Sequence, residues 1–184
     1  MLIPLTAADG FDFDLRYASV DNLLGRPIYR RAIALLHPTA HRALKAASAH
    51  AGALGLRLKI FDAFRPLEAQ WAFWEAAEDK TFVADPRTGG THPRGIAVDL
   101  TLVDGRSGGA ELPMGTDFDA FTASSAHGCL DGLHSEAIRN RALLLGIMTA
   151  CGWEHYSPEW WHYHLPGRET YPALSAADVP EGPM

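Results

Sequence analysis

Cysteine is scarce in this sequence, which contains only Cys129 and Cys151 among 184 residues. Two cysteines cannot build the disulfide framework of a small secreted domain, so we expect both to be packing residues rather than partners in a bridge. Long apolar runs are also missing, since no stretch reaches the roughly 18 consecutive apolar residues of a membrane span. The first residues show no basic stretch before an apolar one, as a secretory signal would. These absences predict a reduced, cytoplasmic protein that does not enter a membrane.

Positive charge is in short supply as well, because 16 Lys and Arg stand against 22 Asp and Glu, for a formal net charge of −6. An acidic chain is a poor candidate for nucleic-acid binding, which depends on neutralising phosphates. The length fits one domain, so we expect a single domain over residues 1–184. Residues 175–184 are polar with two prolines and are expected to form a loose tail. No feature of the sequence indicates an oligomeric state.

Hydrophobic spacing predicts helices and strands in a mixture without a regular βαβ repeat, which favours the α+β class. Residues 104–132 contain six glycines and few periodic residues, and we interpret them as a long irregular segment of a kind that is usually functional or disordered. In the C-terminal half, Ile138, Ala142, Leu145 and Met148 are expected to form the buried face of a helix. Helices are predicted at residues 38–54, 66–78 and 135–150, and strands at residues 11–15, 56–62, 96–102, 153–156 and 161–165.

Two segments place polar or charged residues among apolar ones, at positions where a buried core would usually have apolar side chains. In the first, Pro93 and Gly95 place His92 on a loop at the mouth of a strand. Asp99 then interrupts the alternating apolar residues of that strand. A carboxylate at this position is costly to bury unless it is paired or binds a metal, and the alternative is an aspartate on the wet face of an edge strand.

The second segment places Glu159 and His162 on one side of a short turn, which Ser157 can cap and Pro158 can start. In a hydrolytic metal site the imidazole binds the ion and the carboxylate handles the proton of the attacking water. The alternative is an aromatic strand with surface histidines. Both segments therefore allow a structural and a catalytic interpretation when taken singly.

Taken together, the two segments favour a metal site. His92, Asp99 and His162 supply the three protein ligands that are typical of a catalytic zinc, which keeps one position open for water. Nitrogen and oxygen donors without thiolates also suit zinc better than a soft metal. Glu159 would then be the nearby base.

These segments closely resemble the zinc D-alanyl-D-alanine dipeptidases of the VanX type. The resemblance covers about residues 15–166 and rests mainly on His92-Pro-Arg-Gly-Ile-Ala-Val-Asp-Leu-Thr-Leu and Glu159-Trp-Trp-His-Tyr. Supporting segments follow in the family's order: Tyr17-Ala-Ser-Val-Asp-Asn22, Asp62-Ala-Phe-Arg-Pro66, Met114-Gly-Thr-Asp-Phe-Asp119 and Asn140-Arg-Ala-Leu-Leu144. The family implies a central, mostly antiparallel sheet flanked by helices, the hedgehog/DD-peptidase-like fold.

The resemblance also implies an activity, the zinc-dependent hydrolysis of D-Ala-D-Ala or a closely similar D-dipeptide to free amino acids. One Zn²⁺ per chain would be held by His92, Asp99 and His162. Glu159 would act as general base and then as the acid that protonates the leaving amine. The remaining implied roles are stabilisation of the negative oxygen by Arg65 and binding of the substrate ammonium by Tyr17 and Asp119.

Two positions depart from the family pattern. Gly90 stands where the family usually has a serine close to the substrate, so that hydroxyl is missing or is supplied by Thr91. His164 stands where the family often has another residue, and it shares strand parity with His162, which would bring it near the metal. These departures bear on substrate preference more than on chemistry.

Two other functions remain as alternatives. A D,D-carboxypeptidase or endopeptidase acting on larger peptidoglycan peptides would use the same metal motif. A metal-binding module without activity would be expected to have lost the base, whereas Glu159 is present. Nothing in the sequence chooses between dipeptide recycling and glycopeptide resistance as the role.

Overall fold

A five-stranded sheet forms the centre of the computed structural model, which describes residues 1–106 and 108–184. Its strands lie in the order β2–β4–β5–β7–β6. The pair β2–β4 is parallel and the other neighbouring pairs are antiparallel, so the sheet is mixed but mostly antiparallel, as expected. The strands are β2 (Phe11–Phe13), β4 (Leu56–Asp62), β5 (Ala97–Asp104), β6 (Glu154–His155) and β7 (His162–His164), with β1 (Ile3–Pro4) and β3 (Leu35–Leu36) forming a separate pair.

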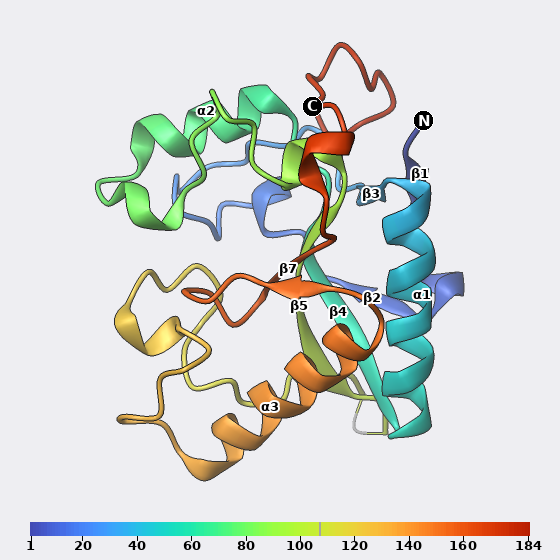
Figure 1. Cartoon of the computed structure of the whole chain (residues 1–184), viewed down its shortest axis with the longest axis vertical. Helices are drawn as coiled ribbons and strands as arrows, with labels where there is room; N and C mark the ends of the chain where they lie inside the picture. The colour runs from blue at the N-terminus through green and yellow to red at the C-terminus, as the bar shows by residue number, and fades with distance from the viewer. Residues whose placement is uncertain (107) are drawn as a thin grey trace.

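Three α-helices flank this sheet (Figure 1). Helix α1 (Pro38–Ala53) starts with a proline in its first turn and contacts both β4 and α3 (Ser135–Ala150). Helix α3 in turn contacts β5 and β6. Helix α2 (Leu67–Ala76) lies at the upper left of the view, on the opposite side from α1 (Figure 1). All three helices agree with the predicted ranges to within two residues.

Strand β5 is buried along almost its whole length, from Ala97 to Val103. It lies between β4 and β7, so it is not an edge strand. Asp99 therefore has no wet face, and the interpretation of this residue as a solvated aspartate is wrong. A carboxylate that is 2% exposed needs a structural partner or a metal.

The buried face of α3 differs from the one predicted by apolar spacing. Ala142 is exposed, whereas Arg141 is 4% exposed and points inward. The Arg141 guanidinium donates hydrogen bonds to backbone carbonyls of the segment that runs from Met114 to Ala126. The buried face of α3 includes this charged residue, so a prediction based on apolar residues alone selects the wrong face. The buried residues of α3 are Ala137, Arg141, Leu144, Ile147 and Met148.

The C-terminal residues are hydrogen-bonded to the body of the protein rather than loose. The backbone N–H of Arg30 donates to the carbonyl of Pro183 at 2.8 Å, and the N–H of Leu174 donates to the carbonyl of Pro93 at 2.8 Å. The expected loose tail at residues 175–184 is thus corrected. A polar composition does not reveal partners that are backbone atoms far away in the sequence.

The long irregular segment at residues 104–132 contains one short 3₁₀ helix, Ala123–Ser125, among its described residues; Ser107 lies outside them. The cysteines, which the sequence assigned to packing, are both free and half-buried. Within the part of the chain that the structure describes, no helix has the length and apolar character needed to cross a membrane.

Candidate active site

Three donor atoms from separate elements meet at one point. His92 lies on a short 3₁₀ helix, Asp99 lies on β5, and His162 begins β7 directly opposite Asp99 in the strand register. The Nε2 atom of His92 is 3.2 Å from both Asp99 Oδ1 and His162 Nδ1, and these last two atoms are 3.1 Å apart. Ligands bound tetrahedrally to zinc at about 2.0–2.1 Å are separated by about 3.3–3.4 Å. The size of the triangle and its N, N, O donor set therefore fit zinc.

Each imidazole is oriented by a hydrogen bond to its other nitrogen. His92 Nδ1 lies 2.6 Å from the carbonyl oxygen of Ala63, to which it donates, so the lone pair of Nε2 faces the common point. His162 Nε2 lies 3.3 Å from the hydroxyl oxygen of Thr91. Burial lowers the pKa of His162, which keeps the ring neutral as a metal ligand requires.

Asp99 is held in its charged form by its neighbours. Burial alone would raise the pKa of this carboxyl, but the adjacent His92 and His162 outweigh that effect and hold the pKa well below its usual range. The second carboxylate oxygen, Oδ2, accepts a hydrogen bond from Arg65 Nη2 at 3.2 Å. One oxygen thus faces the donor triangle while the other faces an arginine.

Arg65 follows β4 and is 9% exposed. Besides Asp99, it donates to Asp62 Oδ2 at 2.9 Å, to Gln70 Oε1 at 3.2 Å and to the Tyr17 hydroxyl at 3.4 Å. A guanidinium has five N–H donors, so these contacts leave one donor for a ligand. The residue is a rigid cation beside the donor triangle.

Sequence reasoning missed two residues that support this cation. Gln70 accepts from Arg65 and donates through Nε2 to the carbonyl of Ala84 at 2.8 Å. Its only signal in the sequence is an amide on the buried face of a short helix. The Tyr29 hydroxyl donates to Asp62 Oδ1 at 2.8 Å. This tyrosine carries no signal, because it lies in an irregular segment far from Asp62 along the chain.

Glu159 lies in the turn between β6 and β7, where its backbone N–H donates to the carbonyl of Tyr156. Its Oε2 atom is 4.0 Å from His162 Nδ1, and the residue is 6% exposed. Burial, followed by the negative charges of Asp99 and Asp119, raises the pKa of this carboxyl well above its usual value. A carboxylate with a raised pKa beside a metal-ligand set has the properties of a general base.

Asp119 comes from the irregular segment and adopts a left-handed backbone conformation, with φ of 59°. The hydroxyl of Tyr17 donates to its Oδ2 atom at 3.1 Å. Burial, and then the charge of Asp99, raises the pKa of Asp119 to about 7. Tyr17 also touches Arg65, so the pair belongs to the same cluster as the donor triangle.

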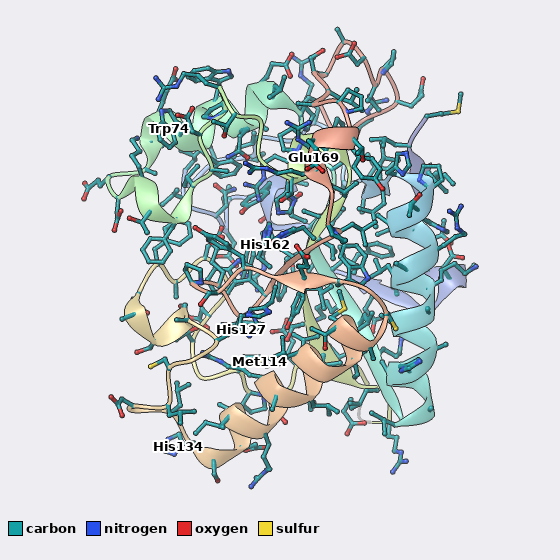
Figure 2. All side chains as sticks on the ribbon, in the orientation of Figure 1. Trp74, Met114, His127, His134, His162 and Glu169 are labelled. Atoms are coloured by element: carbon teal, nitrogen blue, oxygen red, sulfur yellow. The ribbon has the colours of Figure 1, made fainter. Side chains whose placement is uncertain are left out.

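One pocket of about 640 Å³, a volume typical of small-molecule sites, is lined by the donor triangle together with Arg65, Glu159 and the Tyr17–Asp119 pair. Figure 2 shows His162 near the middle of the molecule, with Trp74 and Glu169 of the pocket wall above it. Gly90 and His164, the two departures from the family pattern, line the pocket as well. So do all eight predicted site residues: Tyr17, Arg65, Thr91, His92, Asp99, Asp119, Glu159 and His162.

Known proteins similar to this chain include two curated dipeptidases and one solved structure. The chain is 42% identical over 164 residues to the D-alanyl-D-alanine dipeptidase of Escherichia coli (strain K12), covering 89% of this chain and 83% of that protein. It is 33% identical over 195 residues to the D-alanyl-D-alanine dipeptidase of Enterococcus faecalis (strain ATCC 700802 / V583), covering 88% and 91%. A solved structure, "VanYB in complex with D-Alanine-D-Alanine", aligns with a TM-score of 0.46 at 20% identity over 74% of this chain and 75% of that one.

The donor triangle and the buried glutamate beside it have the chemistry of a metal-dependent hydrolase, and the family that the chain matches is one of metallopeptidases. The family model described as D-ala-D-ala dipeptidase matches residues 5–178, which is almost the whole chain. The chain belongs to the D-ala-D-ala dipeptidase family.

Proposed function

We propose that this protein hydrolyses D-alanyl-D-alanine, or a closely similar D-dipeptide, to free amino acids with one Zn²⁺ per chain. The observation that carries the proposal is the triangle of His92, Asp99 and His162 with Glu159 Oε2 4.0 Å from one of its atoms. The names of the relatives in Escherichia coli and Enterococcus faecalis support the choice of substrate.

The proposed chemistry depends on a base next to the metal. Zinc, when bound, supplies an open position for water and lowers the pKa of that water to about 7. Glu159 accepts a proton from the attacking water and then gives it to the amine that leaves. Burial raises the pKa of this carboxyl, which makes it a stronger proton acceptor than an exposed glutamate.

Arg65 has the electrostatic role in this scheme. Its side chain is fixed by Asp62, Gln70 and Asp99, so it meets the developing negative oxygen without reorganising. A preorganised donor of this kind contributes about 3–4 kcal/mol to the stabilisation of a transition state.

The Tyr17–Asp119 pair is the proposed partner of the substrate's ammonium group. Binding of a cation next to Asp119 would compensate the negative charge that burial disfavours there. Thr91 completes the proposed substrate set, with its hydroxyl shared between His162 and the bound dipeptide.

A cytoplasmic location is part of the same proposal. Free dipeptide is a small molecule that a cytoplasmic enzyme can meet, and both cysteines are free, as is usual in a reducing compartment. Activity in the soluble cytoplasmic fraction, with none in the envelope fractions, is the expected result of cell fractionation.

Hydrolysis of D-Ala-D-Ala by the purified protein, followed by amine release, tests the proposal. We expect rapid cleavage that a chelator abolishes and added zinc restores. L-Ala-L-Ala and N-acetyl-D-Ala-D-Ala are the matched substrates, and neither should be cleaved well. Cleavage of the acetylated substrate in preference to the free dipeptide would contradict the proposal and favour a carboxypeptidase of larger peptides.

A further inference from the structure

A free dipeptide presents two opposite charges to its enzyme, and only one of them has a partner so far. With its ammonium beside Asp119, its carboxylate lies at the other end of the molecule. Two extended residues span on the order of 7 Å, so the carboxylate reaches a different part of the pocket wall. That part needs a hydrogen-bond donor and preferably a cation.

Three cationic side chains line the pocket: Arg65, Lys80 and Arg168. Arg65 is engaged by two buried aspartates, as described above. The Lys80 ammonium donates to the backbone carbonyls of Trp74 and Ala77, at the end of α2. Arg65 thus keeps a single donor, which the proposed chemistry assigns to the developing negative oxygen, and Lys80 has two of its three donors engaged by the backbone.

Arg168 differs from both, because its guanidinium has no hydrogen bond or ion pair with any residue in the described parts of the chain. Its backbone is nevertheless well held. The carbonyl of Arg168 accepts from the N–H of Tyr171 at 3.2 Å, and Arg94 donates to the carbonyl of Tyr171. Arg94 also donates to the carbonyl of Gly90 at 2.9 Å, which joins this segment to the pocket wall beside Thr91. A fixed backbone thus presents a free cation to the pocket.

The charged side chains next to Arg168 in the pocket are negative. Glu154 and Glu169 also line the pocket, and without Arg168 this side would carry negative charge alone. His164 lies on β7, and its Nε2 atom is 3.6 Å from Glu154 Oε2, so it is near one of these two carboxylates.

We propose that Arg168 binds the C-terminal carboxylate of the dipeptide and makes the enzyme specific for substrates that carry a free carboxylate there. This inference rests on the proposed function. Gly90 has no side chain and so cannot make this contact, which Arg168 would make instead. The ammonium and the carboxylate of the substrate are then bound by different residues of the same pocket.

Arg168→Gln tests this assignment, with Arg87→Gln as the matched control. Arg87 is an exposed cation over the ring of Trp74, is paired with Asp85, and does not line the pocket. We expect Arg168→Gln to raise KM for D-Ala-D-Ala about 10- to 100-fold with little change in kcat, as for loss of a charged hydrogen bond. Neither variant should change KM for the C-terminal amide, D-alanyl-D-alaninamide. Arg168→Lys should restore part of the loss.

Binding provides a second readout that does not require turnover. D-Ala-D-Ala is titrated calorimetrically into the zinc-loaded Glu159→Ala protein with and without Arg168→Gln, and the second change should weaken binding by the same factor. Equal behaviour of the two arginine variants, or an equal loss with the amide, would overturn the assignment. Wild-type protein that binds the dipeptide without cleaving it would overturn the proposed function instead, while protein that neither binds nor cleaves it would overturn both.

Discussion

At the scale of single residues, Glu159 should be separable from the metal ligands. Its carboxylate approaches the donor triangle without belonging to it. We therefore expect Glu159→Ala to lower kcat by about 10²–10⁴-fold, the usual worth of a general base, while the protein keeps one zinc per chain by metal analysis. Glu78→Ala, at an exposed position, is the control and should keep full activity. Loss of zinc together with activity would show that Glu159 is a ligand.

The buried carboxyl of Asp119 should make the stability of the protein depend on pH. Its pKa is raised to about 7 in the folded protein, from 3.8 for an unperturbed side chain. The folded state therefore disfavours the charged form, and this destabilisation is complete above pH 7 and disappears as the pH falls towards 4. Asp119→Asn should raise the melting temperature of the metal-free protein at pH 8 and by progressively less towards pH 4.5. Calorimetry that finds the same increase at both pH values would contradict the assignment.

At the scale of elements, α3 holds the irregular segment that carries Asp119. Arg141 donates to the carbonyl of Met114 at 2.6 Å and to the carbonyl of Ser124 at 2.8 Å. Arg141→Met would leave buried carbonyls without partners, so we expect the free energy of unfolding to fall by about 2–3 kcal/mol. KM for the dipeptide should rise more than kcat falls, because the proposed ammonium partner loses its support. Arg139→Met, on the exposed face of the same helix, should change neither quantity.

At the scale of the whole molecule, bound zinc links the segment before β5, β5 itself and β7. A ligand that binds only the folded state stabilises it by about 2.7 kcal/mol when its free concentration is 100 times Kd. Removal of the metal with a chelator should therefore lower the melting temperature, and added zinc should restore it. In His162→Gln the chelator should have no such effect, because the donor triangle is incomplete. A chelator effect of normal size in that variant would place the metal elsewhere.

The sequence predicts those parts of the molecule that depend on local spacing or on short motifs. Periodicity predicts helix α1 and strand β4. Two short sequence motifs, one with His92 and Asp99 and the other with His162, predict the donor triangle. The parts that the sequence does not predict depend on contacts between distant backbone and side-chain atoms. Tyr29 meets Asp62 across 33 positions of the chain, and Arg141 binds carbonyls that any residue could supply. Such partners leave no pattern in the sequence.

The three zinc donors are unevenly spaced along the chain. His92 and Asp99 are separated by 7 positions, whereas His162 lies 63 positions beyond Asp99. In an unfolded chain, bringing the third donor to the other two means closing a long loop, at an entropic cost that grows with the logarithm of its length. In the folded protein the pairing of β5 with β7 has already closed this loop, because Asp99 and His162 are direct partners in the sheet. Full coordination of the metal therefore follows strand pairing, and an unfolded chain competes poorly for the same ion.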